Sequence, residues 1–254
     1  MNRFPGELHF ISLPRCDSTN NYIKRNFKSL QERLPVLVTS GLQTAGRGRE
    51  QRTWVSPPGQ GLYSSFGFKL DSVRNLNFLP LAVGISVIEA LNSAAGVRLG
   101  LKWPNDILHE NKKIAGILIE NVITEEEIFS IAGIGINLNQ DTADFPEELR
   151  ERAVSLKMIS GVAFSPEAIN PVLARVLFGW LEKLKGDGGN EIIDTANGFS
   201  RFLMNKPISF HQPSGNKRIA GIFKGINHDG GLILEDESGN NTIYYSGEII
   251  QLHL

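Results

Sequence analysis

The sequence predicts an α+β protein in which a mixed sheet flanked by helices is followed by a small β-barrel or sandwich. Two observations predict the first part. The chain has long helical segments at Phe78–Ala95 and Pro166–Lys185, and it has long β-like runs at 112–123 and 127–139. A third predicts the second part. From Lys206 onward the chain has short strands separated by the turn sequences PSGN, HDGG and ESGN, a spacing typical of small all-β units. We therefore expect a domain boundary near Asn205.

Local composition justifies the other elements in chain order. Three apolar runs of strand length come before the long helix, at 7–13 (ELHFISL), 34–41 (LPVLVTSG) and 61–70 (GLYSSFGFKL). The sequence DSTN follows the first run and favours a helix start, with Asp17, Ser18 or Thr19 as the N-cap. Pro104 and Asn105 open a turn before the long β runs. After the break GDGG, residues 191–204 have helical spacing, and the expected C-terminal strands are KPISFHQ, RIAGIFKGI, GLILED and NTIYYS.

Composition limits the possible function classes. The chain has 254 residues, 41% hydrophobic and 21% charged, which is enough for a sizeable core. Its 26 basic and 27 acidic residues give no broad charged surface for nucleic acid or an anionic membrane. The single cysteine, Cys16, forms no internal disulfide, and no run approaches the roughly 18 apolar residues of a membrane span. The N-terminus lacks the apolar run of a secretory signal, so we expect a cytoplasmic protein that binds anions only locally.

One loop, TSGLQTAGRGREQRTW (Thr39–Trp54), concentrates positive charge in this nearly neutral chain. Its guanidinium groups can bind carboxylate or phosphate, and its glycines let main-chain N–H groups approach an anion, the residues being Arg47, Arg49, Arg52, Gly46 and Gly48. The pattern is neither a Walker nor a Rossmann fingerprint. A solvated basic loop explains it equally well when it is taken alone.

Two further motifs, KWPNDIL and KKIAGILIE, supply context for the loop. The turn after the first strand places Lys102 and Asp106 near one sheet edge, where Asp106 is free to meet a hydrated or phosphate-bound metal. Lys113 begins the next strand, and Gly116 suggests a bulge or a pocket floor. Strict strand alternation puts Lys113 and Gly116 on opposite faces, so a shared site requires the strand to bend. Each residue also has an ordinary structural explanation, as a turn aspartate, a solvent-facing lysine or a bulge glycine.

In combination, the motifs DSTN, QTAGRGR, KWPND, KKIAGILIE and GIGINLN, in this order, resemble the biotin protein ligase family over nearly the whole chain. The resemblance implies a class II synthetase-like catalytic domain at residues 1–205. The segment IAGIFKGINHDGGLILE resembles the SH3-like barrel of these ligases, which implies such a domain at 206–254. Members that also repress transcription carry a DNA-binding domain before DSTN. Only 16 residues precede Asp17, which favours the monofunctional type, without DNA binding.

The resemblance also implies a reaction and its participants. Biotin and ATP, with Mg²⁺, give biotinyl-5′-adenylate, and a lysine of the biotin carboxyl carrier protein or domain of a carboxylase, such as acetyl-CoA carboxylase, then takes the biotinyl group. Both initial reactants are anions, so positive charge is needed to bring them together. Lys113 is implied as the bridge between the biotin carboxylate and the α-phosphate, and Arg49 as a second catalytic residue. Arg47 and Gly48 are implied to hold the carboxylate.

The resemblance assigns individual binding residues. For biotin it implies hydroxyl and amide groups at the ureido head and an apolar slot for the ring, namely Ser18, Thr19, Asn20, Gln43, Gly46, Arg47, Gly48, Arg49, Lys113, Gly116 and Leu118. For ATP and the adenylate it implies Arg49, Arg52, Trp54, Asp106, Lys113 and Asn137. Asp106 is also the implied metal contact. Helix capping is the alternative role for Ser18 or Thr19.

Several alternatives stay open at this point. A lipoate or octanoate protein ligase shares the catalytic fold, although its arginine-glycine and histidine signature is absent from this sequence. A non-catalytic module that only binds biotin or nucleotide is a second alternative, and nucleic-acid binding a third. A homodimer through a sheet edge is possible, with residues 127–139 as the candidate edge. Residues 140–161 match no familiar pattern and are a candidate to flank the adenine.

Overall fold

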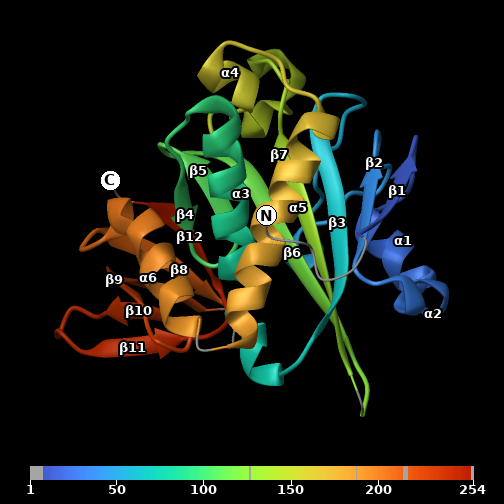
Figure 1. Cartoon of the computed structure of the whole chain (residues 1–254). Coiled ribbons are helices and arrows are strands. Elements are labelled where there is room, and N and C mark those ends of the chain that lie inside the picture. Colours follow the sequence, from blue (N-terminus) through green and yellow to red (C-terminus); the bar gives the residue numbers. More distant parts are fainter. Residues whose placement is uncertain (1–7, 126, 187, 214–216, 253–254) are drawn as a thin grey trace.

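The computed structural model describes residues 8–252 except 126, 187 and 214–216, and it contains two sheets (Figure 1). The larger sheet has seven strands in the order β1-β2-β3-β7-β6-β5-β4. Their bounds are β1 His9–Leu13, β2 Val36–Ser40, β3 Gly61–Leu70, β4 Gly100–Lys102, β5 Asp106–His109, β6 Lys112–Ile123 and β7 Ile128–Asn137. Strands β1 and β2 are parallel and the other neighbours antiparallel, which confirms the predicted mixed sheet.

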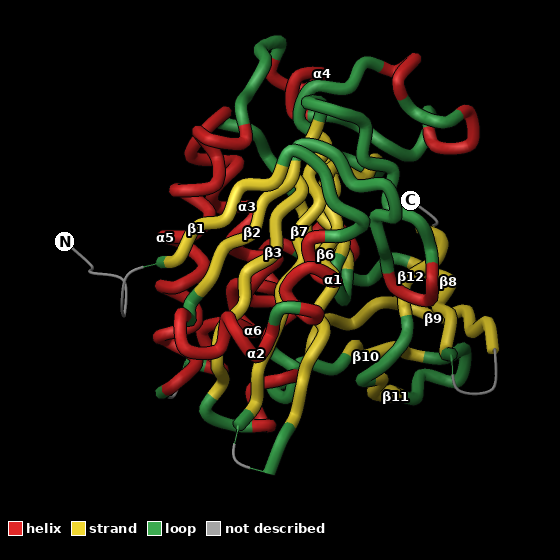
Figure 2. The backbone as a smooth tube through the Cα atoms, turned by 90° about the vertical axis from the view of Figure 1, so that its right-hand side faces the viewer, coloured by secondary structure: helices red, strands yellow, loops and turns green. Residues whose placement is uncertain are grey.

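Helices cover both faces of this sheet (Figure 2). The helices are α1 Thr19–Arg25, α2 Phe27–Leu30, α3 Leu79–Ala95, α4 Leu156–Ser160, α5 Pro166–Lys185 and α6 Gly189–Phe199. Strand β2 shows why two layers form, because its alternating side chains enter different cores. Leu37 packs in the cluster under α3 and α5, while Val36 and Val38 pack with Ile23 of α1 on the opposite face. The result is a helix–sheet–helix arrangement.

The two long helices begin and end where their sequences predict. Ser165 precedes α5 and its hydroxyl accepts a hydrogen bond from the amide of Ala168, and Pro166 occupies the first turn, where no amide partner is required. Helix α3 ends at Gly96, whose φ of 65° is the left-handed conformation that glycine adopts easily. Both helices are rich in apolar residues, and they bury them against each other and the sheet.

The second sheet has five antiparallel strands in the order β11-β10-β9-β8-β12. Its strands are β8 Pro207–Gln212, β9 Lys217–Ile226, β10 Leu232–Glu235, β11 Asn241–Tyr244 and β12 Glu248–Leu252. It packs directly on the edge of the large sheet. Trp103, just after β4, donates from its indole N–H to the Gly230 carbonyl at 3.0 Å, and its ring lies 6.2 Å from that of Phe210. Both sheets therefore share one continuous core.

The structure differs from the sequence-based expectations in three respects. Strands β5 and β12 and helix α4 are additional short elements. The helix expected over 191–204 ends at Phe199 and is followed by a 3-10 turn, Arg201–Leu203. The candidate dimer edge at 127–139 is wrong, because β7 lies between β3 and β6 and both of its sides are hydrogen-bonded. The edges of the sheet are β1 and β4. Among the described residues, every helix is too short or too polar to cross a membrane.

Candidate functional site

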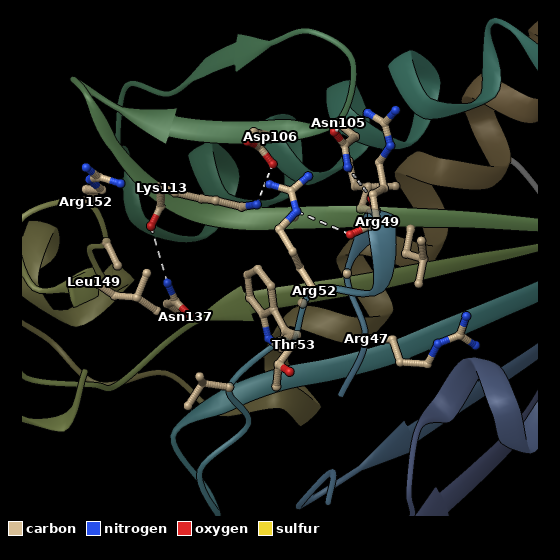
Figure 3. A pocket seen from close by; sticks show the side chains of 18 of the residues that line it. Arg47, Arg49, Arg52, Thr53, Asn105, Asp106, Lys113, Asn137, Leu149 and Arg152 are labelled. Atoms are coloured by element: carbon tan, nitrogen blue, oxygen red, sulfur yellow. Dashed lines mark hydrogen bonds and ion pairs between the residues drawn. The ribbon is translucent and has the colours of Figure 1, made fainter. Parts of the chain in front are cut away.

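One cavity of about 680 Å³ lies between the arginine loop, the β5–β7 region and strand β12. Sequence segments that are far apart meet there, as Figure 3 shows for Arg49 and Arg52 of the loop, Asp106 of β5 and Lys113 of β6. A cavity of this size is in the range of small-molecule sites. Most of the residues predicted for the site line it, namely Ser18, Thr19, Asn20, Gln43, Arg47, Gly48, Arg49, Arg52, Trp54, Asp106, Lys113, Gly116, Leu118 and Asn137.

The floor of the cavity consists of glycines on two neighbouring strands. Gly116 of β6 pairs with Gly135 of β7, and Gly133 pairs with Leu118. A Cβ at residue 135 would lie 2.6 Å from Nε1 of Trp54, and one at 116 would lie 2.9 Å from Cζ3 of the same ring. The absence of side chains therefore lets the indole ring of Trp54 lie directly on the sheet. Gly133 and Gly135 were missed in the sequence, although glycines two residues apart in a strand share one face.

A β-bulge explains how Lys113 and Gly116 reach the same cavity. The β5–β6 register pairs Ile107 with Ala115 but Leu108 with Lys113, so Ile114 is an extra residue in β6. A Cβ at Gly116 would lie 3.1 Å from Nζ of Lys113. The bulge breaks the strict alternation of side chains along β6, which is the condition for Lys113 and Gly116 to share one site. The bulge lies at Ile114 and not at the glycine itself, which was the expected position.

The arginine loop folds into a short hairpin. The amide of Gly48 donates to the Arg52 carbonyl at 2.7 Å, and the amide of Trp54 donates to the Gly46 carbonyl at 2.9 Å. Gly46 belongs to the hairpin but does not line the cavity. It packs closely against the next part of the loop, because a Cβ at residue 46 would lie 2.8 Å from the hydroxyl oxygen of Ser56. The Gly48 amide, expected to face an anion, is thus already bonded within the loop.

The three arginines of the loop point to different partners (Figure 3). Arg49 donates to the side-chain oxygen of Asn105 at 3.3 Å. Arg47 turns away from Lys113, donating to Asn21 at 2.7 Å and lying 3.2 Å from a Glu120 carboxylate oxygen. The third, the guanidinium of residue 52, pairs with Glu248 of β12. Arg47 would have to leave these two partners before it could hold a ligand carboxylate, the role that the sequence predicts for it.

Opposite charges are concentrated around Asp106. Nζ of Lys113 lies 2.5 Å from one oxygen of Asp106, and Nζ of Lys102 lies 2.8 Å from the other. Burial by itself would raise the pKa of the Asp106 carboxyl, but the charges of Lys113 and Lys102 outweigh burial and hold that pKa well below its usual range. Asp106 is therefore ionised, and both lysines have a fixed negative partner. Lys102 was noted in the sequence only as a neighbour of Asp106.

Trp54 lies between the loop and the glycine floor. Nζ of Lys113 is 5.4 Å from the centre of its ring, a cation–π distance. The indole Nε1 is buried and has no hydrogen-bond partner among the described residues. A buried donor of this kind is unusual in folded proteins, and it is one group in the cavity that a ligand can satisfy.

A network of hydroxyl and amide groups fills the inner end of the cavity. The amide of Thr19 donates to Oε1 of Gln43 at 2.9 Å, and Ser65 bonds to both the Thr19 hydroxyl and Oδ1 of Asn20, each at 2.6 Å. Ser18, Thr19 and Asn20 are buried. Ser18 occupies the N-cap of α1 but its side chain makes no capping hydrogen bond, so the capping alternative is wrong for that hydroxyl. Ser65 was not predicted, because its strand shows no polar pattern that singles it out.

Asn137 and the segment after it form another wall. The side-chain amide of Asn137 donates to the carbonyls of Lys113 and Val154, at 3.3 and 3.2 Å. The main chain of Lys113 also pairs with this segment, its amide donating to the Arg152 carbonyl at 2.7 Å. Asn137 therefore fixes the strand that carries Lys113. The segment expected at 140–161 to flank a nucleotide does line the cavity, through Gln140, Asp144, Phe145, Leu149, Arg152 and Ala153.

The surroundings of Asp106 do not resemble a metal site. Its two carboxylate oxygens are each engaged by a lysine ammonium, which competes with a cation. Among the described residues, the group with metal-ligand spacing is Glu50, His211 and Glu248, outside the predicted set. The assignment of Mg²⁺ to Asp106 stays a prediction, and a magnesium ion that arrives with ATP would have to displace Lys113 or Lys102 to reach that carboxylate.

Comparison with known proteins agrees with this geometry. Residues 12–139 match the biotin/lipoate A/B protein ligase family, and residues 204–251 match the biotin protein ligase C-terminal domain. The chain is similar to the bifunctional ligase/repressor BirA of Bacillus spizizenii, with 32% identity over 82% of this chain. It spans about 64% of the length of that relative.

Two further proteins are covered almost completely. A biotin--[acetyl-CoA-carboxylase] ligase of Paracoccus denitrificans is 32% identical over 91% of this chain and 96% of its own length. The structure of the biotin protein ligase of Aquifex aeolicus in complex with biotin and ATP has a TM-score of 0.79 and 30% identity, covering 96% of this chain and 98% of that one. By these matches along both of its parts, the chain belongs to the biotin protein ligases of the biotin/lipoate A/B protein ligase family.

Proposed function

We propose that the protein is an ATP-dependent ligase that activates biotin as biotinyl-5′-AMP and transfers it to a lysine of a biotin carboxyl carrier protein. One observation carries the proposal: a single cavity combines a glycine floor, a buried hydroxyl–amide network and the cations Lys113, Arg49 and Arg52. The names of the Paracoccus and Aquifex relatives support it. In this proposal residues 1–205 supply the catalytic unit, and residues 206–254 close one side of its cavity.

Biotin enters with its head toward the inner end of the cavity. Its ureido group has two N–H donors and one carbonyl acceptor, which match the Thr19 and Gln43 side chains and their neighbours Ser18 and Asn20. Its flat apolar ring lies on the glycine floor at Gly116, where it takes the place of the Trp54 ring edge and the Lys113 side chain that pack there in this structure. The valeryl carboxylate then extends toward Lys113.

Lys113 and the loop arginines bring two anions together. Lys113 leaves Asp106 to bridge the biotin carboxylate and the α-phosphate of ATP, which lowers their repulsion as the new bond forms. Arg49 and Arg52 bind phosphate oxygens, and pyrophosphate leaves. Trp54 and the apolar side chains Phe145 and Leu149 enclose the adenylate and exclude water. A carrier lysine amine then attacks the mixed anhydride and AMP leaves.

The test measures both half-reactions separately. Biotin-dependent ATP–pyrophosphate exchange reports adenylate formation, and mass spectrometry of a carrier domain incubated with enzyme, biotin and Mg-ATP reports transfer. Exchange with biotin but not with lipoate or octanoate supports the proposal. Exchange only with lipoate or octanoate identifies a ligase for that acid, and biotin binding without any exchange identifies a non-catalytic module.

The proposal extends to the surroundings of the enzyme. We place the reaction in the cytoplasm, where ATP and newly made carboxylase subunits are present, and without a DNA partner. A homodimer remains part of the proposal, through β1, the edge of the large sheet opposite β4, on which the C-terminal sheet packs. Sedimentation of the protein with and without biotin and ATP measures the oligomeric state.

A further inference from the structure

Asp106 has two lysine partners, and they differ in how firmly they are held. Lys113 lies 2.5 Å and Lys102 lies 2.8 Å from its carboxylate oxygens. Lys102 also donates to the main-chain carbonyl of Ile249 in β12, at 3.1 Å. Its side chain is 19% exposed, compared with 36% for Lys113. Lys102 is thus fixed between the two sheets, whereas Lys113 extends into the cavity (Figure 3).

The second lysine changes the cost of moving the first. The Asp106 side chain is only 15% exposed, and a buried carboxylate without a counter-ion is strongly unfavourable because it has lost hydration without compensation. If Lys113 were the single partner, its movement toward a substrate anion would leave that carboxylate unpaired. With Lys102 in place, Asp106 keeps one counter-ion throughout.

We propose that Lys102 is a positioning residue for biotin activation, whose ammonium stays on Asp106 so that Lys113 can leave Asp106 for the anionic substrates. The inference rests on the proposed function of Lys113 and deepens it. Lys102 lines the same cavity, and in this role it acts through Asp106, not by contact with the biotin carboxylate or the phosphate. The C-terminal sheet takes part, because the Ile249 carbonyl holds the Lys102 ammonium in place.

A set of variants tests this role in biotin-dependent ATP–pyrophosphate exchange. We expect Lys102→Met to lower the maximal rate more than tenfold with a smaller change in the KM for biotin, and Lys102→Arg to retain most of the rate. The double variant Lys102→Met/Asp106→Asn should recover at least tenfold over Lys102→Met, because no buried carboxylate then holds Lys113. A double variant no faster than Lys102→Met overturns the proposal, as does a wild-type rate in Lys102→Met.

The control is Lys69→Met, which removes a lysine from an exposed pair with Glu127 at 2.5 Å, away from the cavity. It should leave the exchange rate unchanged. If the wild-type protein itself shows no biotin-dependent exchange, the proposed function fails, and the counter-ion role is then decided by stability alone.

Thermal unfolding supplies that second readout. Lys102→Met and Lys113→Met each leave Asp106 with one lysine partner, whereas the double variant leaves it with neither lysine and only the more distant charge of Arg52. We therefore expect the double variant to lose more in melting temperature than the two single losses added together. Losses that simply add contradict the shared-carboxylate arrangement, whatever the activity of the enzyme.

Discussion

Replacing Gly135 by alanine tests whether the glycine floor of the cavity is the surface on which biotin lies. The new Cβ would stand 2.4 Å from Cε2 and 2.6 Å from Nε1 of Trp54, well inside the ordinary contact distance of 3.4 Å. The indole would have to retreat by about 1.0 Å, the difference between 3.4 and 2.4 Å. The Trp54 ring also packs against Gly116 and Lys113. The ring therefore cannot move aside as easily as the end of a flexible side chain would.

The expected magnitude follows from this overlap. Forcing one methyl group into a packed site costs about 1–3 kcal/mol. If that cost appears on biotin binding, the Kd rises roughly 5- to 140-fold, at about 1.4 kcal/mol for each factor of ten. Isothermal titration calorimetry with biotin measures the Kd, and circular dichroism confirms that the variant remains folded.

Gly179→Ala is the matched control for this change. Residue 179 lies in α5 with nothing within 4 Å of the added Cβ, and alanine favours helix, so this variant should bind biotin normally and melt no earlier than the wild type. A Gly135→Ala protein that binds biotin within twofold of the wild type would refute the placement of biotin on the glycine floor.

Three other predictions concern charge. Lys113→Ala should reduce biotin-dependent pyrophosphate exchange by at least a hundredfold and weaken biotin binding by less than tenfold, and near-normal exchange contradicts its role. Arg49→Ala should keep the melting temperature and speed the dissociation of biotinyl-adenylate in a stopped-flow chase, whereas unchanged dissociation excludes Arg49 as a clamp. The pKa of Asp17 is held well below its usual range by hydrogen bonds from Arg25, so this pair stabilises the fold above about pH 4 and its contribution is lost as the pH falls through the folded pKa. Asp17→Asn should therefore unfold at lower urea than the wild type at pH 7, with a difference that shrinks in acid; a constant difference argues against the charge effect.

Much of the fold could be predicted because its long elements carry strong local signals. Strands β3 and β6 and helix α5 have the expected bounds, since apolar runs, glycines and a capping serine define them. Strand order carries no such signal. The position of β7 in the middle of the sheet depends on contacts with β3 and β6, which its own sequence does not encode.

The site was predicted best where residue chemistry is distinctive. Lysine, arginine and carboxylate positions in the motifs do line one cavity. The position of the bulge at Ile114 could not be predicted, because an extra residue in a strand can be recognised only from its pairing with the neighbouring strand. Ser65 and strand β12 were missed for a similar reason. Ser65 joins the site through hydrogen bonds from β3 to Thr19 and Asn20 of helix α1, and β12 through contact between the two sheets.

The position of strand β12 has a practical consequence for purification. Its residues Glu248, Ile249 and Leu252 line the cavity, so a peptide tag fused beyond this strand starts beside the cavity. Strand β1 lies at the other edge of the large sheet, on the opposite side of the molecule from β12 (Figure 2). An affinity handle placed ahead of β1 should leave access to the cavity open, whereas the same handle behind β12 should compete with the carrier protein of the proposed reaction.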